Sequence, residues 1–294
     1  MASRVAPTPR TIHAPHVIAL GVLKAVALNG ILLALSLLAL VPFWWMLTGG
    51  FKSLGDLFAF PPRLWPSTWT LDGYQKLFRY FPFLRNFMNS VMIAGLSTFG
   101  NLLSSSLAAF AFARMRFPGK NVLFMLFLST LMIPGIVYLI PQFMVFRFLR
   151  WINSPLPLIV PAFFGNAFSI FMLRQFLSTL PAELEAAAKI DGANWPRIYF
   201  EISLPLIKPV LVTLGLFAFM GSWNDLLGPI IYLSRLDQLN LTAAAAYLRT
   251  SYHSGENQNV EMAAATITVI PVLLVFVFAQ RYIVSSLVFS GLKG

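Results

Sequence analysis

The chain has 294 residues, of which 58% are hydrophobic, 15% aromatic and 11% charged, and its mean hydropathy is +0.75. A soluble domain carries roughly 25% charged residues, so this chain has too few charges to cover a surface that faces water. The composition excludes a soluble enzyme and a disordered chain. The net charge is +11, but most Lys and Arg lie in short gaps between apolar runs, which is typical of membrane topology and not of nucleic-acid binding. We predict an integral membrane protein.

Six segments are long and apolar enough to cross the roughly 30 Å hydrocarbon core as helices. They are Ala25–Leu47, Phe87–Ala113, Val122–Phe146, Leu158–Leu177, Val210–Leu233 and Met262–Val284. The first has no cleavage site after it and is too long for a secretory signal, so we expect it to be retained. The sequence therefore predicts an all-α polytopic membrane protein, with a six-helix membrane domain over residues 25–284 between tails 1–24 and 285–294.

An even number of spans places both tails on one side of the membrane. More than half of the 21 Lys and Arg fall on that side, so we predict that both termini are cytoplasmic. Four prolines lie at or near membrane depth, where they indicate either packing kinks or the hinges and cavity walls of a transporter. They are Pro134, Pro141, Pro229 and Pro271.

The long outer loop 49–85 ends in a short amphipathic pattern. Leu71, Tyr74, Leu77 and Phe78 recur at helical spacing. We predict a short helix that lies on the membrane surface or beneath a soluble partner.

The loop between the fourth and fifth spans, residues 178–205, contains the signals of two short helices. Ser178 or Thr179 is the expected cap of the first, and Gly192 ends it where a positive φ is common. Asn194 is the expected cap of the second, and Pro205 is expected to stop it.

The first of these helices has a low, smooth surface made by the alanines at 186–188. Ile190, Trp195 and Tyr199 provide larger side chains beside it, so the segment is suited to docking against another protein. An ordinary connecting helix is the alternative that these features leave open.

The same loop resembles the EAA loop of ABC-importer permease subunits. The family pattern is Glu-Ala-Ala, three residues, Gly, nine residues, then Ile-x-Leu-Pro, and Gly192 and the segment 202–205 match it in spacing. Glu185 stands one position early, because Ala186 occupies the glutamate position of the pattern. One residue is a rotation of about 100° around a helix, so the glutamate's family role is not carried over by position.

Further short matches extend the resemblance over nearly the whole chain and point to carbohydrate-uptake permeases of the maltose type, specifically the smaller permease subunit. They are Phe51-Lys52-Ser53, Asn89-Ser90, Trp223-Asn224-Asp225 with Pro229, Gln280-Arg281-Tyr282 and the terminal Gly291-Leu292-Lys293-Gly294. The resemblance implies the type I ABC-importer permease fold, in the cytoplasmic (inner) membrane of a bacterium or archaeon.

The resemblance implies that this chain forms half of a translocation path for a sugar. The implied sugar is a mono- or oligosaccharide, and acidic saccharides and sugar phosphates are among the candidates. The implied partners are a second homologous permease, two ATP-binding subunits that hold ATP and Mg, an external substrate-binding protein and the lipid bilayer. The chain itself has no Walker A sequence, no Cys and three scattered His, so we expect no catalytic residue, metal or cofactor of its own. The expected ATPase-coupling residues are Glu185, Ala187, Ala188, Ile190, Asp191, Gly192, Trp195, Ile202, Leu204 and Pro205.

Asp225 is the only acid placed within a predicted span, and intramembrane acids usually face a bundle interior or a water-filled path. Together with Trp223 and Asn224 it offers a carboxylate, an aromatic face and an amide, a set that suits a polyol. Further candidates for the translocation path are Asn101, Asn166 and Ser169. Hydrogen bonds between helices are the alternative role for these polar residues.

Competing functions remain open at this point. A secondary transporter would need buried ion-coupling acids, and Asp225 alone is thin support for one. A membrane-embedded enzyme would need converging catalytic groups, and a structural subunit would not explain the spacing from Gly192 to Pro205. Within the ABC importers, a non-sugar solute is the alternative substrate.

Overall fold

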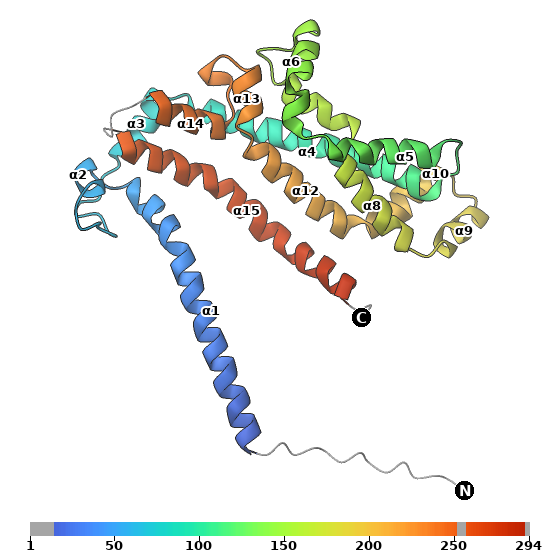
Figure 1. Cartoon of the computed structure of the whole chain (residues 1–294), viewed down its shortest axis with the longest axis horizontal. Helices are drawn as coiled ribbons and strands as arrows, with labels where there is room; N and C mark the ends of the chain where they lie inside the picture. Colours follow the sequence, from blue (N-terminus) through green and yellow to red (C-terminus); the bar gives the residue numbers. More distant parts are fainter. Residues whose placement is uncertain (1–14, 252–256, 292–294) are drawn as a thin grey trace.

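The computed structural model describes residues 15–251 and 257–291, and the regular elements within these ranges are all helical, as predicted. Two of the long helices are α1 (Pro15–Gly49) and α15 (Gln258–Gly291). The third, α4 (Phe83–Arg114), runs through the body of the molecule (Figure 1). The helix α15 continues into the predicted C-terminal tail.

Within the described residues, four continuous helical segments are long and apolar enough to span a membrane: Leu23–Gly49, Phe83–Arg114, Leu156–Thr179 and Gln258–Phe278. Two further helix pairs pass the same test together but are sharply bent, so these residues contain four to six candidate spans. The segment Leu156–Thr179 contains α7 (Leu156–Ile159), η3 (Val160–Phe164) and α8 (Ala167–Thr179).

The third predicted span, Val122–Phe146, is not one straight helix, because the chain bends by 95° at Pro134, one of the prolines predicted to mark a kink or hinge. Pro134 lacks an N–H and forces the residue before it out of the helical region, and Ile133 is accordingly extended, with φ −91° and ψ 114°. The two arms are built from α5 (Lys120–Ser129) and η1 (Thr130–Met132), then η2 (Gly135–Tyr138) and α6 (Leu139–Phe148).

The fifth predicted span, Val210–Leu233, is also wrong in its bounds. Its main helix, α12 (Lys208–Trp223), ends ten residues early, and a separate short helix, α13 (Leu227–Tyr232), follows after a break. On the other side α12 is joined, through a bend of 76°, to the helical segment Trp195–Leu206.

The core forms where α4 packs against α8 and α12, and where α12 packs against α15. At one end of α4 the buried residues centre on Phe110, Leu173 and Ile198. At the other end they centre on Trp223 and Leu77. We name these the α9 end and the α3 end, because α9 (Glu183–Ile190) and α3 (Asp72–Tyr80) lie at opposite ends of the body in Figure 1.

The predicted amphipathic helix is confirmed as α3. Leu77 is completely buried among the residues of α12 and α15, whereas Leu71 and Phe78 are exposed. Gly73 lies so close to α15 that a Cβ there would be 2.8 Å from the carbonyl oxygen of Asn259. The helix is therefore fixed against the start of α15.

The outer loop before α3 folds on itself around Asp56, which belongs to α2 (Leu54–Leu57). Its carboxylate accepts hydrogen bonds from the backbone and hydroxyl of Ser67 and from Arg63, and the bonds from Ser67 are the main reason that the pKa of Asp56 is lowered. Lys52 is buried, donates to the carbonyl of Arg63 at 2.6 Å and lies 3.7 Å from the Trp45 ring centroid. The loop is a folded cap rather than a free connection.

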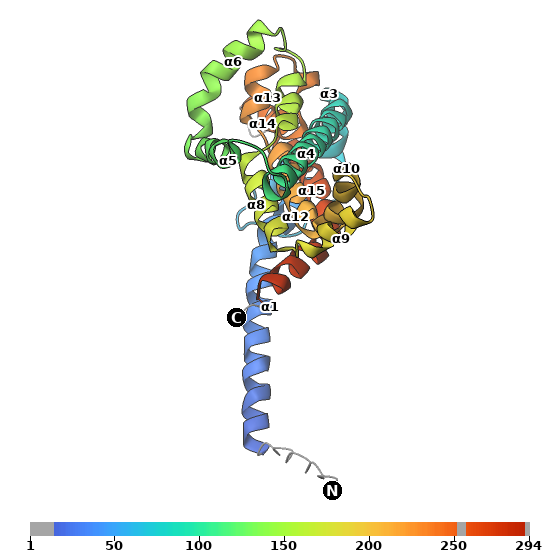
Figure 2. The same ribbon diagram turned by 90° about the vertical axis from the view of Figure 1, so that its right-hand side faces the viewer.

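The helix α1 extends away from the body and contacts α15 only near its own carboxyl end (Figures 1 and 2). Gly49 lies against Met262, and Thr266 donates to the carbonyl of Met46. Along Leu23–Phe43 the large apolar side chains are exposed on all sides of the helix, so this segment requires lipid or another chain around it.

Candidate coupling loop and translocation path

The helix α9 begins later than the sequence suggests. Ser178 and Thr179 donate their hydroxyls to the carbonyls of Arg174 and Phe176, so both belong to the last turn of α8. The residue before α9 is Ala182, which offers no side-chain cap. The predicted caps are therefore wrong, because these hydroxyls already bond within the preceding helix.

The end of α9 is as predicted. Gly192 has a φ of +79°, and the N–H of Ala193 donates to the carbonyl of Ala188 at 2.9 Å, a left-handed helix ending. A Cβ on Gly192 would meet no atom within 4 Å, so glycine is required here by backbone conformation and not by crowding within this chain.

The second helix of the loop begins as predicted and ends within one residue of the predicted stop. The Oδ1 of Asn194 accepts from the N–H of Arg197 at 3.0 Å. The helix then runs through α10 (Trp195–Arg197), a π-helical turn η4 (Ile198–Ser203) and α11 (Leu204–Leu206). Pro205 is followed by only one more residue of this helical segment, which ends at Leu206 where the chain bends by 76° into α12, so the predicted stop is confirmed to within one residue.

The outward side of α9 is open to a partner. Ile190 is 87% exposed, and Ala187, Asp191 and Gly192 are exposed beside it. Ala188 faces the other way and packs against the core at the α9 end. The exposed apolar and small side chains make a docking surface that this chain does not cover.

Aromatic side chains fix the base of this surface to α4. Trp195 packs edge-on against Phe110, with ring centroids 6.0 Å apart, and Lys189 lies over the Trp195 ring. Tyr199 is buried and its hydroxyl is 2.7 Å from that of Ser106. Tyr199 is therefore not the exposed anchor that was predicted. It ties the loop to α4.

Glu185 is bound within the chain. Its Oε1 lies 2.7 Å from Nε of Arg114, the last residue of α4, and the two side chains are 13% and 11% exposed. Arg114 also donates from Nη2 to the carbonyl of Leu180 at 2.9 Å. Nothing in the sequence was a reason to select Arg114. It lies 71 residues before Glu185, and no sequence pattern predicts that two such distant residues meet. The other coupling candidates, Ile202 and Leu204, are half-buried, and Pro205 is exposed.

Trp223 has no exposed surface. Its Nε1 donates to the carbonyl of Thr268 at 3.2 Å, and its own carbonyl accepts from Thr242. In this conformation the ring packs between helices and is not available to a sugar. Asn224, the next residue, is exposed.

Asp225 lies in the break between α12 and α13. Its Oδ1 accepts from the N–H of Gly228 at 3.1 Å, and Asn240 donates to its backbone carbonyl at 2.7 Å. A Cβ on Gly228 would lie 2.5 Å from Asp225 Oδ2, so only glycine fits this turn. The carboxylate thus starts α13 while remaining partly accessible.

A cavity of about 330 Å³ opens beside Asp225. Its polar side chains come from three segments of the chain, and Tyr232 donates a hydrogen bond to Oε1 of Gln142 across it at 3.3 Å. The lining residues are Gly135, Tyr138, Leu139, Gln142, Pro157, Leu158, Ser222, Asp225, Leu227, Gly228, Ile231 and Tyr232. Sequence analysis missed Tyr138, Gln142 and Tyr232, because the bends after α5 and α12 bring them together.

Asn101, Asn166 and Ser169 lie elsewhere. Asn166 caps α8 by accepting from the N–H of Ser169, and its own N–H donates to Ser105, which in turn donates to Oδ1 of Asn101. These residues join α4 to the start of α8 and do not line the cavity, so the structure uses them as hydrogen bonds between helices.

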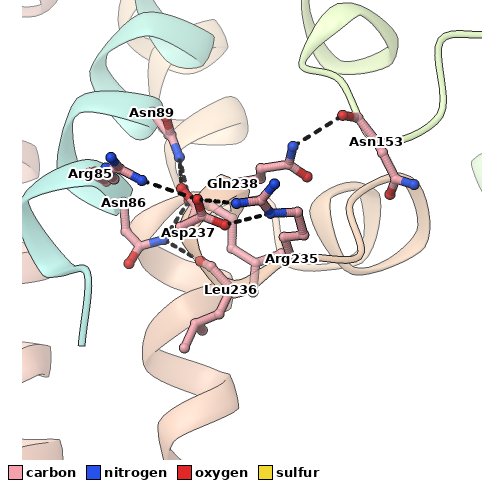
Figure 3. Close-up of polar contacts among 9 residues, drawn as sticks. Arg85, Asn86, Asn89, Asn153, Arg235, Leu236, Asp237 and Gln238 are labelled. Atoms are coloured by element: carbon pink, nitrogen blue, oxygen red, sulfur yellow. Dashed lines mark hydrogen bonds and ion pairs between the residues drawn. The ribbon is translucent and has the colours of Figure 1, made fainter. Parts of the chain in front are cut away.

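At the α3 end, a polar cluster holds η5 (Leu236–Gln238) against α4 (Figure 3). Asn86 donates to the carbonyls of Leu236 and Leu239 at 2.7 and 2.9 Å. Asp237 accepts from Arg85 and from Arg235, and hydrogen bonding to Arg235 is the main reason that the pKa of Asp237 is lowered. We call this set of contacts the α4–η5 clasp. The chain continues from η5 directly into α14 (Leu241–Ser251).

Comparison with known proteins decides the family. Residues 100–288 match the model of the binding-protein-dependent transport system inner membrane component. The chain belongs to this family. The matched region contains the loop with α9, the cavity beside Asp225 and most of α15.

This permease is similar over most of its length to named transport permeases. It is 35% identical over 233 residues to the arabinooligosaccharides transport system permease protein AraQ of Halalkalibacterium halodurans, covering 78% of this chain and 81% of that protein. It is 32% identical to the inner membrane ABC transporter permease protein YcjP of Escherichia coli, over 88% and 92% of the two chains. Both relatives are membrane components of transport systems.

The permease also shares its fold with a solved structure. A chain from a bacterial ABC transporter involved in import of the acidic polysaccharide alginate superimposes with a TM-score of 0.76 at 22% identity, covering 94% of this chain and 99% of that one. The predicted ABC-importer permease fold and the multi-pass inner-membrane location are confirmed.

Proposed function

We propose that this permease forms half of the translocation path of an ABC importer for a saccharide. The observation that carries the proposal is the exposed docking surface of α9, ended by left-handed Gly192, in a chain of the binding-protein-dependent family. Relatives of this chain are named as permeases for arabinooligosaccharides and for diacetylchitobiose. An oligosaccharide is therefore the substrate class we propose.

The partners follow from the surfaces that are left open. We propose that α9 docks on one of two cytoplasmic ATP-binding subunits, which hold the ATP and Mg, while this chain hydrolyses nothing. A second homologous permease completes the path, and apolar side chains exposed along α1 and α6, such as Leu38 and Ile140, are the faces offered to it and to lipid. A substrate-binding protein delivers the sugar from outside.

Coupling requires that the ATP-bound partners favour one permease conformation. Reversing a 1:99 population to 99:1 takes about 5.5 kcal/mol of differential affinity. In the described residues α9 contacts α4 through Arg114, and the segment that follows α9 contacts α4 through Phe110 and Ser106. We propose that movement of the docked loop is transmitted to the bundle through α4.

For the sugar, we propose contact in the cavity beside Asp225. Tyr138 and Tyr232 supply rings, and Gln142, Ser222 and Asp225 supply polar atoms, the combination that small polyol ligands require. Asn224 is a neighbour of this cavity in sequence but does not line it. The variant Gln142→Ala is expected to raise KM for uptake several-fold with little change in basal ATP hydrolysis, measured in proteoliposomes.

The first experiment is affinity purification of the tagged permease from its native membrane, with copurifying proteins identified by mass spectrometry. Recovery of a second permease and a Walker-containing ATPase supports the proposal, and the attached binding protein is then screened against oligosaccharides. Recovery of the chain alone, with uptake that needs no ATP, would overturn it in favour of a secondary transporter.

A further inference from the structure

The turn that joins α4 to α5 lines an open, basic hollow of about 440 Å³, at the same end of α4 as the docking loop. Its lining residues are Arg116, Phe117, Gly119, Lys120, Asn121 and Val122. Neither the coupling loop nor the sugar cavity uses these side chains.

Three cations gather around the hollow. The positive charges of Arg116 and Arg174 both act on Lys120, whose Nζ is held near the turn by donating to the carbonyl of Met115 at 3.0 Å. Arg174 is fixed from α8, with its guanidinium 3.9 Å from the centroid of the Phe124 ring. These contacts hold like charges close together, an arrangement that an anion would relieve.

Carboxylates do not neutralise this cluster. Among residues 15–251 and 257–291, no ion pair joins an acidic side chain to Arg116, Lys120 or Arg174. The carboxylate known to lie at this end of α4, Glu185, is already paired with Arg114. The hollow therefore presents positive charge without a counter-ion from the described part of the chain.

An apolar face continues from the hollow along α5. Val122, Met125 and Leu126 are 60%, 64% and 59% exposed, and their spacing places them on one side of the helix. Phe124 points the other way, into the core. A cationic pocket that runs into an exposed apolar stripe at the end of a membrane helix matches an amphiphile, with its phosphate in the pocket and its acyl chains on the stripe.

We propose that this hollow binds an anionic phospholipid, with the phosphate held by Arg116 and Lys120 and the acyl chains against Val122 and Met125. The acyl-chain stripe favours a lipid over an acidic segment of a soluble partner. The site is independent of the proposed substrate and of the ATPase. It holds the end of α4 next to the docking loop in the membrane surface.

The test is native mass spectrometry of the full-length chain, equilibrated in detergent with equal amounts of phosphatidylglycerol and phosphatidylcholine. The wild type is expected to retain phosphatidylglycerol preferentially. The double variant Arg116→Gln with Lys120→Gln is expected to lose that preference by about fivefold for each cation removed. Equal retention of the two lipids by the wild type, or undiminished preference in the double variant, overturns the site.

The matched control removes two exposed arginines, Arg147 and Arg150, which lie at the far end of the bent span. Arg150 has a φ of +59°, so it is replaced by Asn, which tolerates that conformation, and Arg147 by Gln. This control is expected to keep the lipid preference. A second variant, Val122→Ser with Met125→Ser, keeps all the cations and is expected to bind less phosphatidylglycerol. Unchanged binding would indicate a phosphate site without acyl-chain contact and would overturn the lipid assignment.

Discussion

The two ends of α4 are held by different chemistry. At the α3 end, Asn86 and Asn89 donate to three backbone carbonyls of the η5 segment, at 2.7–3.1 Å. At the α9 end, α9 itself is joined to α4 by one ion pair, Arg114–Glu185, and its outward side is exposed. The segments before and after α9 are held more firmly, by the bond from Arg114 to the carbonyl of Leu180 and by Trp195 and Tyr199 against α4. Several bonds to backbone fix a position, whereas a helix held by a single side-chain pair between two anchored segments can tilt. We therefore expect α9 to be the part that moves.

Of the changes considered, replacing Gly192 at the α9 end is expected to have the largest effect on coupling to ATP hydrolysis. The variant Gly192→Glu forces a left-handed backbone on a non-glycine residue, at about 1–2 kcal/mol, and adds a charge to the docking surface. We expect substrate-stimulated ATP hydrolysis of the assembled transporter to fall to the unstimulated rate, with membrane insertion intact. Gly192→Asn, which tolerates this φ, is expected to keep most of the stimulation. Wild-type-like uptake by Gly192→Glu would remove α9 from the coupling surface.

Breaking the ion pair is expected to have the next largest effect. Arg114→Ala leaves a mostly buried carboxylate on Glu185 and an unpaired carbonyl on Leu180, at a cost of about 3 kcal/mol. Hydrogen exchange of residues 180–192 should quicken, and ATP hydrolysis should become uncoupled from substrate. Arg114→Lys keeps the charge but not both contacts, so an intermediate result is expected. Unchanged exchange in Arg114→Ala would show that the aromatic contacts alone hold the loop.

At the opposite end, Asn86→Ala removes two hydrogen bonds to the carbonyls of Leu236 and Leu239. Because Asn86 is buried, we expect about 1–3 kcal/mol of local destabilisation, seen as faster hydrogen exchange in residues 236–244. Asn89→Ala, in a half-buried position beside it, is the matched control with a smaller effect. Faster exchange in residues 180–192 as well would contradict the independence of the two ends.

The smallest expected effect is a loss of stability of the α4–η5 clasp at acidic pH. Folding lowers the pKa of Asp237, chiefly through hydrogen bonding to Arg235, so its ionised form favours the folded clasp. That contribution is complete above the unfolded value of about 3.9 and is lost as the pH falls through the lowered folded value. Exchange at residues 236–239 should therefore quicken in acid, and Asp237→Asn should remove this dependence. A pH profile identical in the variant would exclude Asp237 as its source.

Local signals in the sequence were sufficient for several parts of the structure. The membrane class, α3, the Asn194 cap and the left-handed ending at Gly192 each depend on residues within about one or two helical turns. Family spacing from Gly192 to Pro205 identified the loop, and the helical segment ends at Leu206, one residue after Pro205. Patterns that extend over one or two helical turns are set by backbone chemistry and periodicity, and both can be read from a single sequence.

Only the tertiary structure decided which distant residues meet. It paired Glu185 with Arg114, turned Tyr199 and Trp223 inward, and brought Gln142 and Tyr232 to the cavity of Asp225 through two breaks in the predicted spans. These outcomes depend on the angle of each bend and on which face of each helix is covered. Hydropathy does not encode them, because in a membrane chain almost every face is apolar and the burial that orients a soluble helix is missing from its sequence.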